Sequence, residues 1–225
     1  MSALLAARAV HKSFSRTEAL RGVSLEVGVG ESVAVTGPSG SGKSTLLLCL
    51  SGILRPEAGE VHFDGDRIDR LRERERSLLR RRSFGLVLQF GQLLPELSAG
   101  QNVALPLILE GHPRAESRRA ALAWLERLEA LDLADAAPAE LSGGEQQRVA
   151  VARALVTGPR VVFADEPTGA LDTVAGEQVL GQLLGAVRDV GATLVLVTHD
   201  NRVAARADRE VVLRDGVLDP AGVRS

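Results

Sequence analysis

The sequence has few aromatic residues: among its 225 residues there is no tyrosine and one tryptophan, and aromatic side chains make up 3% of the chain. So few rings supply little material for the stacking platforms that bind single-stranded nucleic acid. The net charge of −2 and the pI near 6.1 also lack the basic excess that binding to a phosphate backbone requires. We therefore expect no nucleic-acid partner.

Cysteines and long apolar runs are scarce as well. The single Cys49 cannot form an internal disulfide or a multi-cysteine metal site, which favours a reducing compartment. The longest uncharged runs, 83–95 and 97–109, have 13 residues each and contain Gln, Gly and Pro, so neither is long enough to cross a bilayer. Residues 1–10 contain no basic leader, so no signal peptide is expected. These features predict a cytoplasmic protein with no membrane span.

The composition is otherwise that of a globular protein, with 45% hydrophobic and 25% charged residues. The length of 225 residues corresponds to about one and a half average domains. One α/β domain with an insertion is therefore expected rather than two independent cores. Two lysines against 25 arginines are typical of a GC-rich bacterial coding sequence.

Apolar patterning predicts strands that alternate with helices. Strands are expected at 24–27, 32–36, 84–89, 160–165 and 193–198, and helices at 43–54, 66–82, 115–131 and 148–156. The stretch around Gly91, Pro95 and Gly100 is expected to be irregular. The alternation predicts a parallel sheet, in which ligands bind at the carboxyl ends of the strands.

Two of the predicted helices carry side chains with more than one interpretation. In the segment 66–82, charges of both signs and pairs such as Glu73 with Arg76 are typical of a solvated helix face. The alternative is that Arg80–Arg82 contact acidic lipid or the cytoplasmic loops of a partner. Trp124 is expected to pack on the apolar side of the helix 115–131.

A phosphate-binding motif follows the strand predicted at 32–36. It comprises Gly37, Pro38, Ser39, Gly40, Ser41, Gly42, Lys43 and Ser44, and it fits the pattern G-x-x-x-x-G-K-[ST] with a strand before it and a helix after it. The glycines let backbone N–H groups converge on β- and γ-phosphate oxygens, and the helix N-terminus adds positive potential. Lys43 contributes a full charge, and Ser44 can offer its hydroxyl to Mg²⁺. The motif predicts binding of a nucleoside triphosphate.

Two carboxylates end the apolar run 161–166. Adjacent side chains on an extended backbone face opposite ways, so one can reach a metal while the other reaches water. Taken alone, such a pair also suits a helix cap or a solvated turn. Because the phosphate-binding loop lies in the same chain, we assign Asp165 to Mg²⁺ and Glu166 to the role of general base.

Three further segments have both a catalytic and a structural interpretation. His199 can donate to a γ-phosphate oxygen, and Gln89 can reach the water shell of a metal, but a structural histidine and a surface amide remain open. The segment 141–147, Leu-Ser-Gly-Gly-Glu-Gln-Gln, precedes the helix predicted at 148–156. It makes a second anion-binding helix start, which suggests a nucleotide supplied by another subunit, whereas the alternative is an ordinary Ser-capped helix.

Together these motifs resemble those of the nucleotide-binding subunit of ATP-binding-cassette (ABC) transporters. The resemblance covers nearly the whole chain and includes the Walker A loop 37–45, the Q-loop Gln89, the signature 141–147, the Walker B segment 161–166, the D-loop 170–172 and the switch His199. It implies that Lys43, Gln89, Glu166 and His199 are catalytic and that Ser44, Gln89 and Asp165 hold Mg²⁺. The residues that it implies for ATP binding are Phe14, Gly37, Pro38, Ser39, Gly40, Ser41, Gly42, Lys43, Ser44, Thr45, Ser142, Gly143, Gly144, Glu145 and Asp172. Phe14 would stack on adenine, with a place in the core as its alternative.

The resemblance also implies a fold, the α/β P-loop NTPase fold. Its parts are a RecA-like parallel sheet core, an antiparallel β subdomain and a helical subdomain that carries the signature. We expect a single nucleotide-binding domain over residues 1–225, with its core at 1–88 and 158–225 and the Q-loop and helical subdomain at 89–157.

The segments 94–95, 102–107 and 165–172 look like those of the lipoprotein-releasing and macrolide-exporting branch. That branch implies a head-to-tail homodimer, with ATP between Walker A of one copy and Ser142–Gly144 of the other, beside an integral-membrane permease at the inner face of the cell membrane. Extrusion of a substrate is the expected output, and mechanical control of a cell-wall hydrolase is the alternative. The segment 90–92 departs from the family pattern after the Q-loop glutamine, which bears on the identity of the permease.

Two other classes of P-loop protein fit the sequence less well. ABC-type ATPases of DNA repair and translation carry long coiled coils or a second cassette, and this chain has neither. Small-molecule P-loop kinases carry no signature of the kind found at 141–147.

Overall fold

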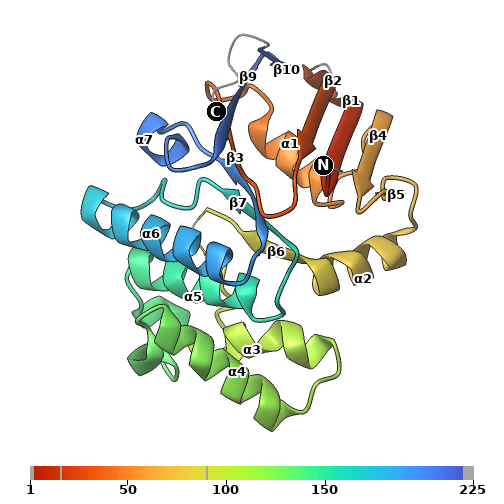
Figure 1. Cartoon of the computed structure of the whole chain (residues 1–225). Helices are drawn as coiled ribbons and strands as arrows, with labels where there is room; N and C mark the ends of the chain where they lie inside the picture. The colour runs from red at the N-terminus through yellow and green to blue at the C-terminus, as the bar shows by residue number, and fades with distance from the viewer. Residues whose placement is uncertain (1–2, 16, 90, 220–225) are drawn as a thin grey trace. The chain divides into compact units, whose positions relative to one another are not determined.

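The chain forms two compact units, shown together in Figure 1. The computed structural model describes residues 3–15, 17–89 and 91–219, so Phe90 of the departing segment lies outside the described residues. The first unit comprises residues 1–80 and 193–225, and the second comprises residues 81–192. The expected subdomain boundaries at residues 88 and 158 stay a prediction.

The first unit contains an antiparallel sheet with the strand order β2-β1-β4-β5. Its strands are β1 (Leu5–Phe14), β2 (Thr17–Val27), β4 (Ala58–Phe63) and β5 (Asp66–Arg67). Strand β5 contradicts the helix expected from residue 66, because the turn at Asp64 and Gly65, both with positive φ, returns the chain onto β4. The helix α2 (Glu73–Ser83) begins only after this strand.

Parallel strands form the other sheet region of the first unit. Strand β3 (Ser32–Thr36) pairs in parallel with β8 (Thr193–Val197) on one side and with β9 (Arg209–Arg214) on the other, and β10 (Val217–Leu218) pairs antiparallel with β9. Helix α1 (Lys43–Leu50) follows β3, and the short helix α7 (Asn201–Ala204) follows β8. Helix α1 is shorter than expected because Ser51 ends it.

The second unit combines a parallel strand pair with helices. Strands β6 (Phe84–Val87) and β7 (Val161–Asp165) pair in parallel, and the rings of Phe84 and Phe163 pack edge to face at 5.2 Å. Figure 1 shows α3 (Ala99–Leu109), α4 (Arg114–Arg127) and α5 (Gly143–Leu155) packed against one another, with α6 (Thr173–Asp189) beside α5. Short 3₁₀ turns lie at Leu131–Leu133 and Pro138–Glu140. No helix in the described ranges is long and apolar enough to cross a membrane.

Helix α3 corrects the expectation of an irregular stretch around Gly100. Ser98 and Gln101 form a reciprocal capping box that starts the helix, and Pro106 lies within it. The buried Asn102 side chain donates to Leu94 O at 3.0 Å and accepts from Leu94 N at 2.8 Å, so it ties the preceding loop to the helix. Capping and tertiary contact therefore outweigh the helix-breaking residues.

Helices α4 and α5 also differ from expectation at their ends. Helix α4 ends at Arg127 rather than at residue 131, since Glu129 has a positive φ of 54°. Helix α5 begins at Gly143 rather than at residue 148, because Ser142 caps it.

Trp124 is half-buried, and the Arg127 guanidinium lies 4.6 Å from the centre of its ring.

The three arginines at 80–82 donate hydrogen bonds to backbone carbonyl groups and carboxylates of the protein. Arg80 donates to Gly52 O at 2.8 Å and to Glu73 Oε1 at 2.8 Å. Arg81 donates to Leu109 O at 3.0 Å, and Arg82 donates to Glu110 Oε2 at 3.0 Å. These bonds tie the three guanidinium groups to the protein itself, and contact of the cluster with acidic lipid or with the cytoplasmic loops of a partner stays an untested alternative.

Candidate functional site

The Walker A loop has a backbone that only glycine can adopt at two positions. Gly37 has a φ of +141°, and a β-carbon on it would lie 2.0 Å from Leu213 O. Gly42 has a φ of +101°, and a β-carbon there would lie 2.2 Å from Ala19 O. At both positions the backbone of a neighbouring strand fills the place that a side chain would need.

Lys43 begins α1 and turns its ammonium group back onto the loop. Its side chain is 7% exposed, and Nζ donates to Gly37 O at 2.8 Å and to Pro38 O at 2.9 Å. No side chain caps the helix, and its first turn contains no acidic residue. Backbone N–H groups, the helix dipole and one ammonium charge therefore make this end of the helix electropositive, as an anion site requires.

Ser44 and Thr45 follow Lys43 on α1, and Ser44 is exposed. Ser39 and Gly40 are exposed at the tip of the loop, whereas Ser41 is buried. Ser44 is therefore accessible at the start of the helix, where the sequence predicts a contact with a metal.

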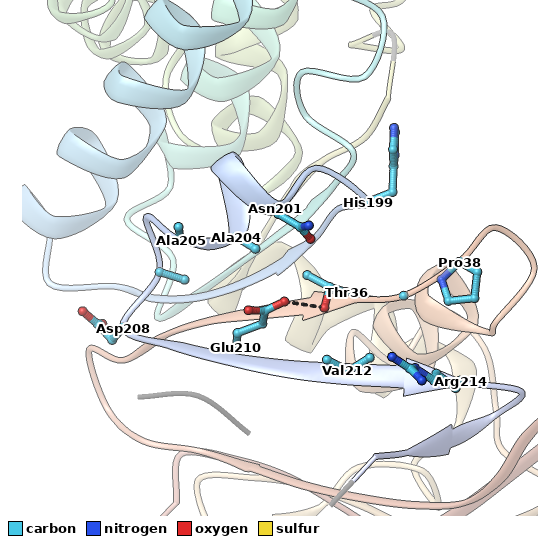
Figure 2. A pocket seen from close by; sticks show the side chains of 12 residues that line it. Thr36, Pro38, His199, Asn201, Ala204, Ala205, Asp208, Glu210, Val212 and Arg214 are labelled. Atoms are coloured by element: carbon cyan, nitrogen blue, oxygen red, sulfur yellow. Dashed lines mark hydrogen bonds between the residues drawn. The ribbon is translucent and has the colours of Figure 1, made fainter. Parts of the chain in front are cut away.

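A cavity of about 700 Å³ lies beside the first residues of the loop. In Figure 2, Thr36 and Glu210 meet on its floor, where Thr36 Oγ1 donates to Glu210 Oε1 at 2.7 Å. His199 is exposed and follows β8, and its ring points away from this pair (Figure 2). The next residue, Asp200, caps α7, and its hydrogen bonds with Arg202 hold the pKa of its carboxyl below the usual range.

Phe14 lies at the end of β1 in the same unit and is 47% exposed. Lys12 Nζ lies 5.5 Å from the centre of its ring. Exposure of this size argues against the core interpretation of Phe14, and its stacking on adenine stays a prediction.

The second unit brings Gln89 and Glu166 close together. Gln89 Nε2 and Glu166 Cβ each lie 3.4 Å from the point where a β-carbon on Gly169 would be. Asp165, the last residue of β7, and Glu166 are both half-buried. Glu166 has a φ of +46°, a left-handed conformation that costs free energy at a non-glycine residue and is concentrated at functional sites.

The signature segment forms the N-terminus of α5. The Glu145 carboxylate accepts from Ser142 N and from Ser142 Oγ, both at 2.7 Å, and Ser142 Oγ accepts from Glu145 N at 3.4 Å. The hydrogen bonds from Ser142 lower the pKa of Glu145. A β-carbon on Gly143 would lie 3.2 Å from Leu171 Cδ2, so the signature packs directly against the D-loop.

Asp172 in the D-loop has an observed structural role. Its carboxylate accepts from Val174 N and from Ala175 N, both at 3.0 Å, and thereby caps α6. Its contact with nucleotide stays a prediction.

The predicted site residues divide between the two units. The first unit holds Phe14, the Walker A loop 37–45 and His199, and the second holds Gln89, Ser142–Glu145, Asp165, Glu166 and Asp172. Two polar residues of α5, Gln147 and Arg153, contact the backbone around Gln89. The sequence motif includes Gln147 in the signature but gives it no contact of this kind, and Arg153 was not predicted. The signal for Arg153 was a lone charge in the otherwise apolar run 149–155.

Comparison with known proteins gives one consistent family. Residues 20–169 match the family described as ABC transporter. The lipoprotein-releasing system ATP-binding protein LolD of Paramagnetospirillum magneticum is 44% identical over 211 residues, which cover 94% of this chain and 93% of LolD. The macrolide export ATP-binding/permease protein MacB of Brucella melitensis is 45% identical over 92% of this chain. This chain spans about a third of the length of MacB, since the match covers 32% of it.

A solved structure agrees with the sequence relatives. The dimeric structure of a post-hydrolysis state of the ATP-binding cassette MJ0796, bound to ADP and Pi, is 38% identical. It aligns with a TM-score of 0.91 and covers 98% of both chains. The α/β architecture, with parallel strands and a separate antiparallel sheet, is therefore that of an ABC ATPase, and the chain belongs to the ABC transporter family as one of its ATP-binding cassettes.

Proposed function

We propose that this chain hydrolyses ATP to drive a membrane-embedded permease that exports a substrate or a lipoprotein. The observation that carries the proposal is the Walker A loop, in which Gly37 and Gly42 exclude side chains and Lys43 lies buried against the loop carbonyls. Such a loop at an uncapped helix start binds phosphate groups. The likeness to LolD and MacB supports export as the output.

In this proposal the phosphates of ATP lie along the Walker A loop, and Lys43 directs its remaining donor at them. The oxygen-bearing side chains of Ser44, Gln89 and Asp165 are of the kind that Mg²⁺ prefers, and they would hold it beside the phosphates. Mg²⁺, when bound, supplies positive charge that offsets the charge on the transferred phosphoryl group. Phe14 stacks on the adenine ring.

Glu166 is the general base of the proposed reaction. Its carboxylate accepts a proton from the attacking water, whose oxygen forms a bond to the γ-phosphorus as the bond to the β-γ bridging oxygen breaks. Gln89 lies next to Glu166 in the second unit. The exposed His199 donates to a γ-phosphate oxygen and so senses whether that phosphate is present.

Two copies of the chain form the working unit in this proposal. ATP bound to Walker A of one copy would be covered by Ser142, Gly143, Gly144 and Glu145 of the other, in a head-to-tail dimer. The dimeric state of MJ0796 supports this arrangement. The cassette would bind the permease at the inner face of the cell membrane. ATP binding and hydrolysis in the cassette would then drive conformational changes in the permease.

The test replaces the proposed base while keeping its shape. Glu166→Gln should retain ATP binding and lower the rate of phosphate release by about 10²-fold or more, as loss of a positioned catalytic group does. Lys43→Ala should instead weaken ATP binding measured by titration. An unchanged phosphate-release rate in Glu166→Gln would contradict the role of Glu166, and wild-type ATP affinity in Lys43→Ala would contradict the phosphate site itself.

A further inference from the structure

A half-buried arginine on α5 holds the backbone that follows Gln89. The Arg153 guanidinium donates to Gly91 O at 2.7 Å and to Gln92 O at 3.0 Å. In the part of the chain that the structure describes, no carboxylate forms an ion pair with Arg153. Burial accordingly lowers the pKa of Arg153. The two carbonyl groups are thus the contacts that compensate this charge.

Those two hydrogen bonds constrain the backbone of Gly91 and Gln92 as well as the Arg153 side chain. Taking a cation out of water is costly unless its donors are satisfied. If the segment 91–92 moved away, Arg153 would keep its buried charge and lose both acceptors. Arg153 therefore ties the backbone of Gly91 and Gln92 to α5.

A second residue of α5 holds the backbone before Gln89. The Gln147 side chain is 3% exposed, and its Nε2 donates to Leu88 O at 3.3 Å. Gly91 also packs tightly against α5, because a β-carbon on it would lie 3.0 Å from Gln146 O. Helix α5 therefore contacts the chain on both sides of Gln89.

We propose that Arg153 and Gln147 are positioning residues that place the Gln89 amide for its role beside the metal and the γ-phosphate. This inference rests on the proposed function, in which Gln89 takes part in the reaction. Neither α5 residue contacts the reacting atoms in this account. Each acts through described backbone near Gln89: Gln147 through Leu88, and Arg153 through Gly91 and Gln92.

The experiment is a double-mutant cycle between Arg153→Met and Gln89→Ala in the full chain. Phosphate release is measured against the concentrations of ATP and of Mg²⁺. Arg153→Met should lower kcat roughly tenfold, because small displacements of a positioning group are costly, and it should raise the Mg²⁺ concentration for half-maximal activity. In the Gln89→Ala background it should cause no further loss, since residues that act as one unit are not additive.

Three further variants separate positioning from general destabilisation. Arg188→Met removes an exposed arginine at the end of α6 and should leave both parameters at wild-type values. Arg153→Lys keeps the charge and one donor to the loop, so it should recover part of kcat. Gln147→Met tests the second anchor and should also raise the Mg²⁺ requirement, which keeps the inference testable if Arg153→Met does not fold.

The outcomes distinguish this inference from the proposed function. If Gln89→Ala is impaired and Arg153→Met lowers its activity by a further tenfold, the positioning role is wrong and the function of the site stands. If Gln89→Ala is as active as wild type, the catalytic role of Gln89 is wrong and the inference is overturned with it. A loss of activity in Arg153→Met at an unchanged Mg²⁺ requirement would also overturn the inference.

Discussion

Gly40 and Gly42 lie two residues apart in the Walker A loop and differ in what surrounds them. Both have a positive φ, +78° for Gly40 and +101° for Gly42. Apart from its chain neighbours, no atom of the described residues lies within 4 Å of the place where a β-carbon on Gly40 would be, whereas a β-carbon on Gly42 would overlap Ala19 O. The sequence motif does not distinguish the two glycines. The structure shows that a side chain at Gly40 would meet only an unfavourable backbone conformation, whereas one at Gly42 would also clash with Ala19.

Gly42→Ala should therefore be far more damaging than Gly40→Ala. A left-handed conformation costs a non-glycine residue roughly 1–2 kcal/mol, which is the whole expected cost at Gly40. Gly42→Ala adds the clash, so the loop must shift, and ATP binding should be lost together with part of the stability. Urea unfolding and an ATP titration of the two variants measure this difference, and equal effects would contradict the clash.

At the scale of elements, buried strands were predicted best. Strands β3, β7 and β8 were expected close to their observed bounds, since each is a run of consecutive apolar residues that can only be buried. Helix α3 was missed because Gly91, Pro95 and Gly100 were read as an irregular stretch, and the start of the helix depends on the capping box at Ser98. Strand β5 was mistaken for helix because its charged residues pair with β4 across a turn.

The end of β5 leads into a buried ion pair that anchors the antiparallel sheet. Asp69 is 7% exposed; it accepts from Val61 N at 2.9 Å and from Arg67 Nε at 3.0 Å. Burial alone would raise the pKa of Asp69, but the hydrogen bonds from Arg67 and Val61 outweigh it and lower the pKa. Its carboxylate therefore stabilises the fold above the ordinary aspartate pKa of about 3.9, and this stabilisation is lost as the pH falls through the lower folded-state pKa.

Asp69→Asn should lower the free energy of unfolding by about 2 kcal/mol at pH 7, because it weakens the pair and leaves buried donors poorly satisfied. The difference from wild type should shrink at an acidic pH below the lowered folded-state pKa of Asp69, where the wild-type carboxylate becomes protonated. Urea unfolding at both pH values measures the change. Asp66→Asn, an exposed neighbour on β5, is the matched control and should be nearly neutral. A difference that does not depend on pH would contradict the ion-pair account.

At the scale of the whole molecule, the motifs predicted the family but not the contacts that hold the site residues in place. Walker A, the Q-loop and the signature are short local patterns, so they can be recognised in one sequence. The contacts of Arg153 reach a segment some sixty residues earlier in the chain, and no local pattern encodes such a pairing.

A mixing experiment tests whether two copies share each ATP site. Lys43→Ala removes the phosphate-binding ammonium, and Gly144→Asp places a carboxylate where the phosphate of the partner's ATP is proposed to lie, so each variant alone should be nearly inactive. A heterodimer of the two retains one intact pair, Walker A of the Gly144→Asp copy with the signature of the Lys43→Ala copy. Equimolar mixing should then restore about a quarter of the wild-type rate if the sites act independently. If each ATP site were completed within one chain, neither variant could regain activity from the other. Failure of the mixture to hydrolyse ATP would therefore contradict the head-to-tail arrangement.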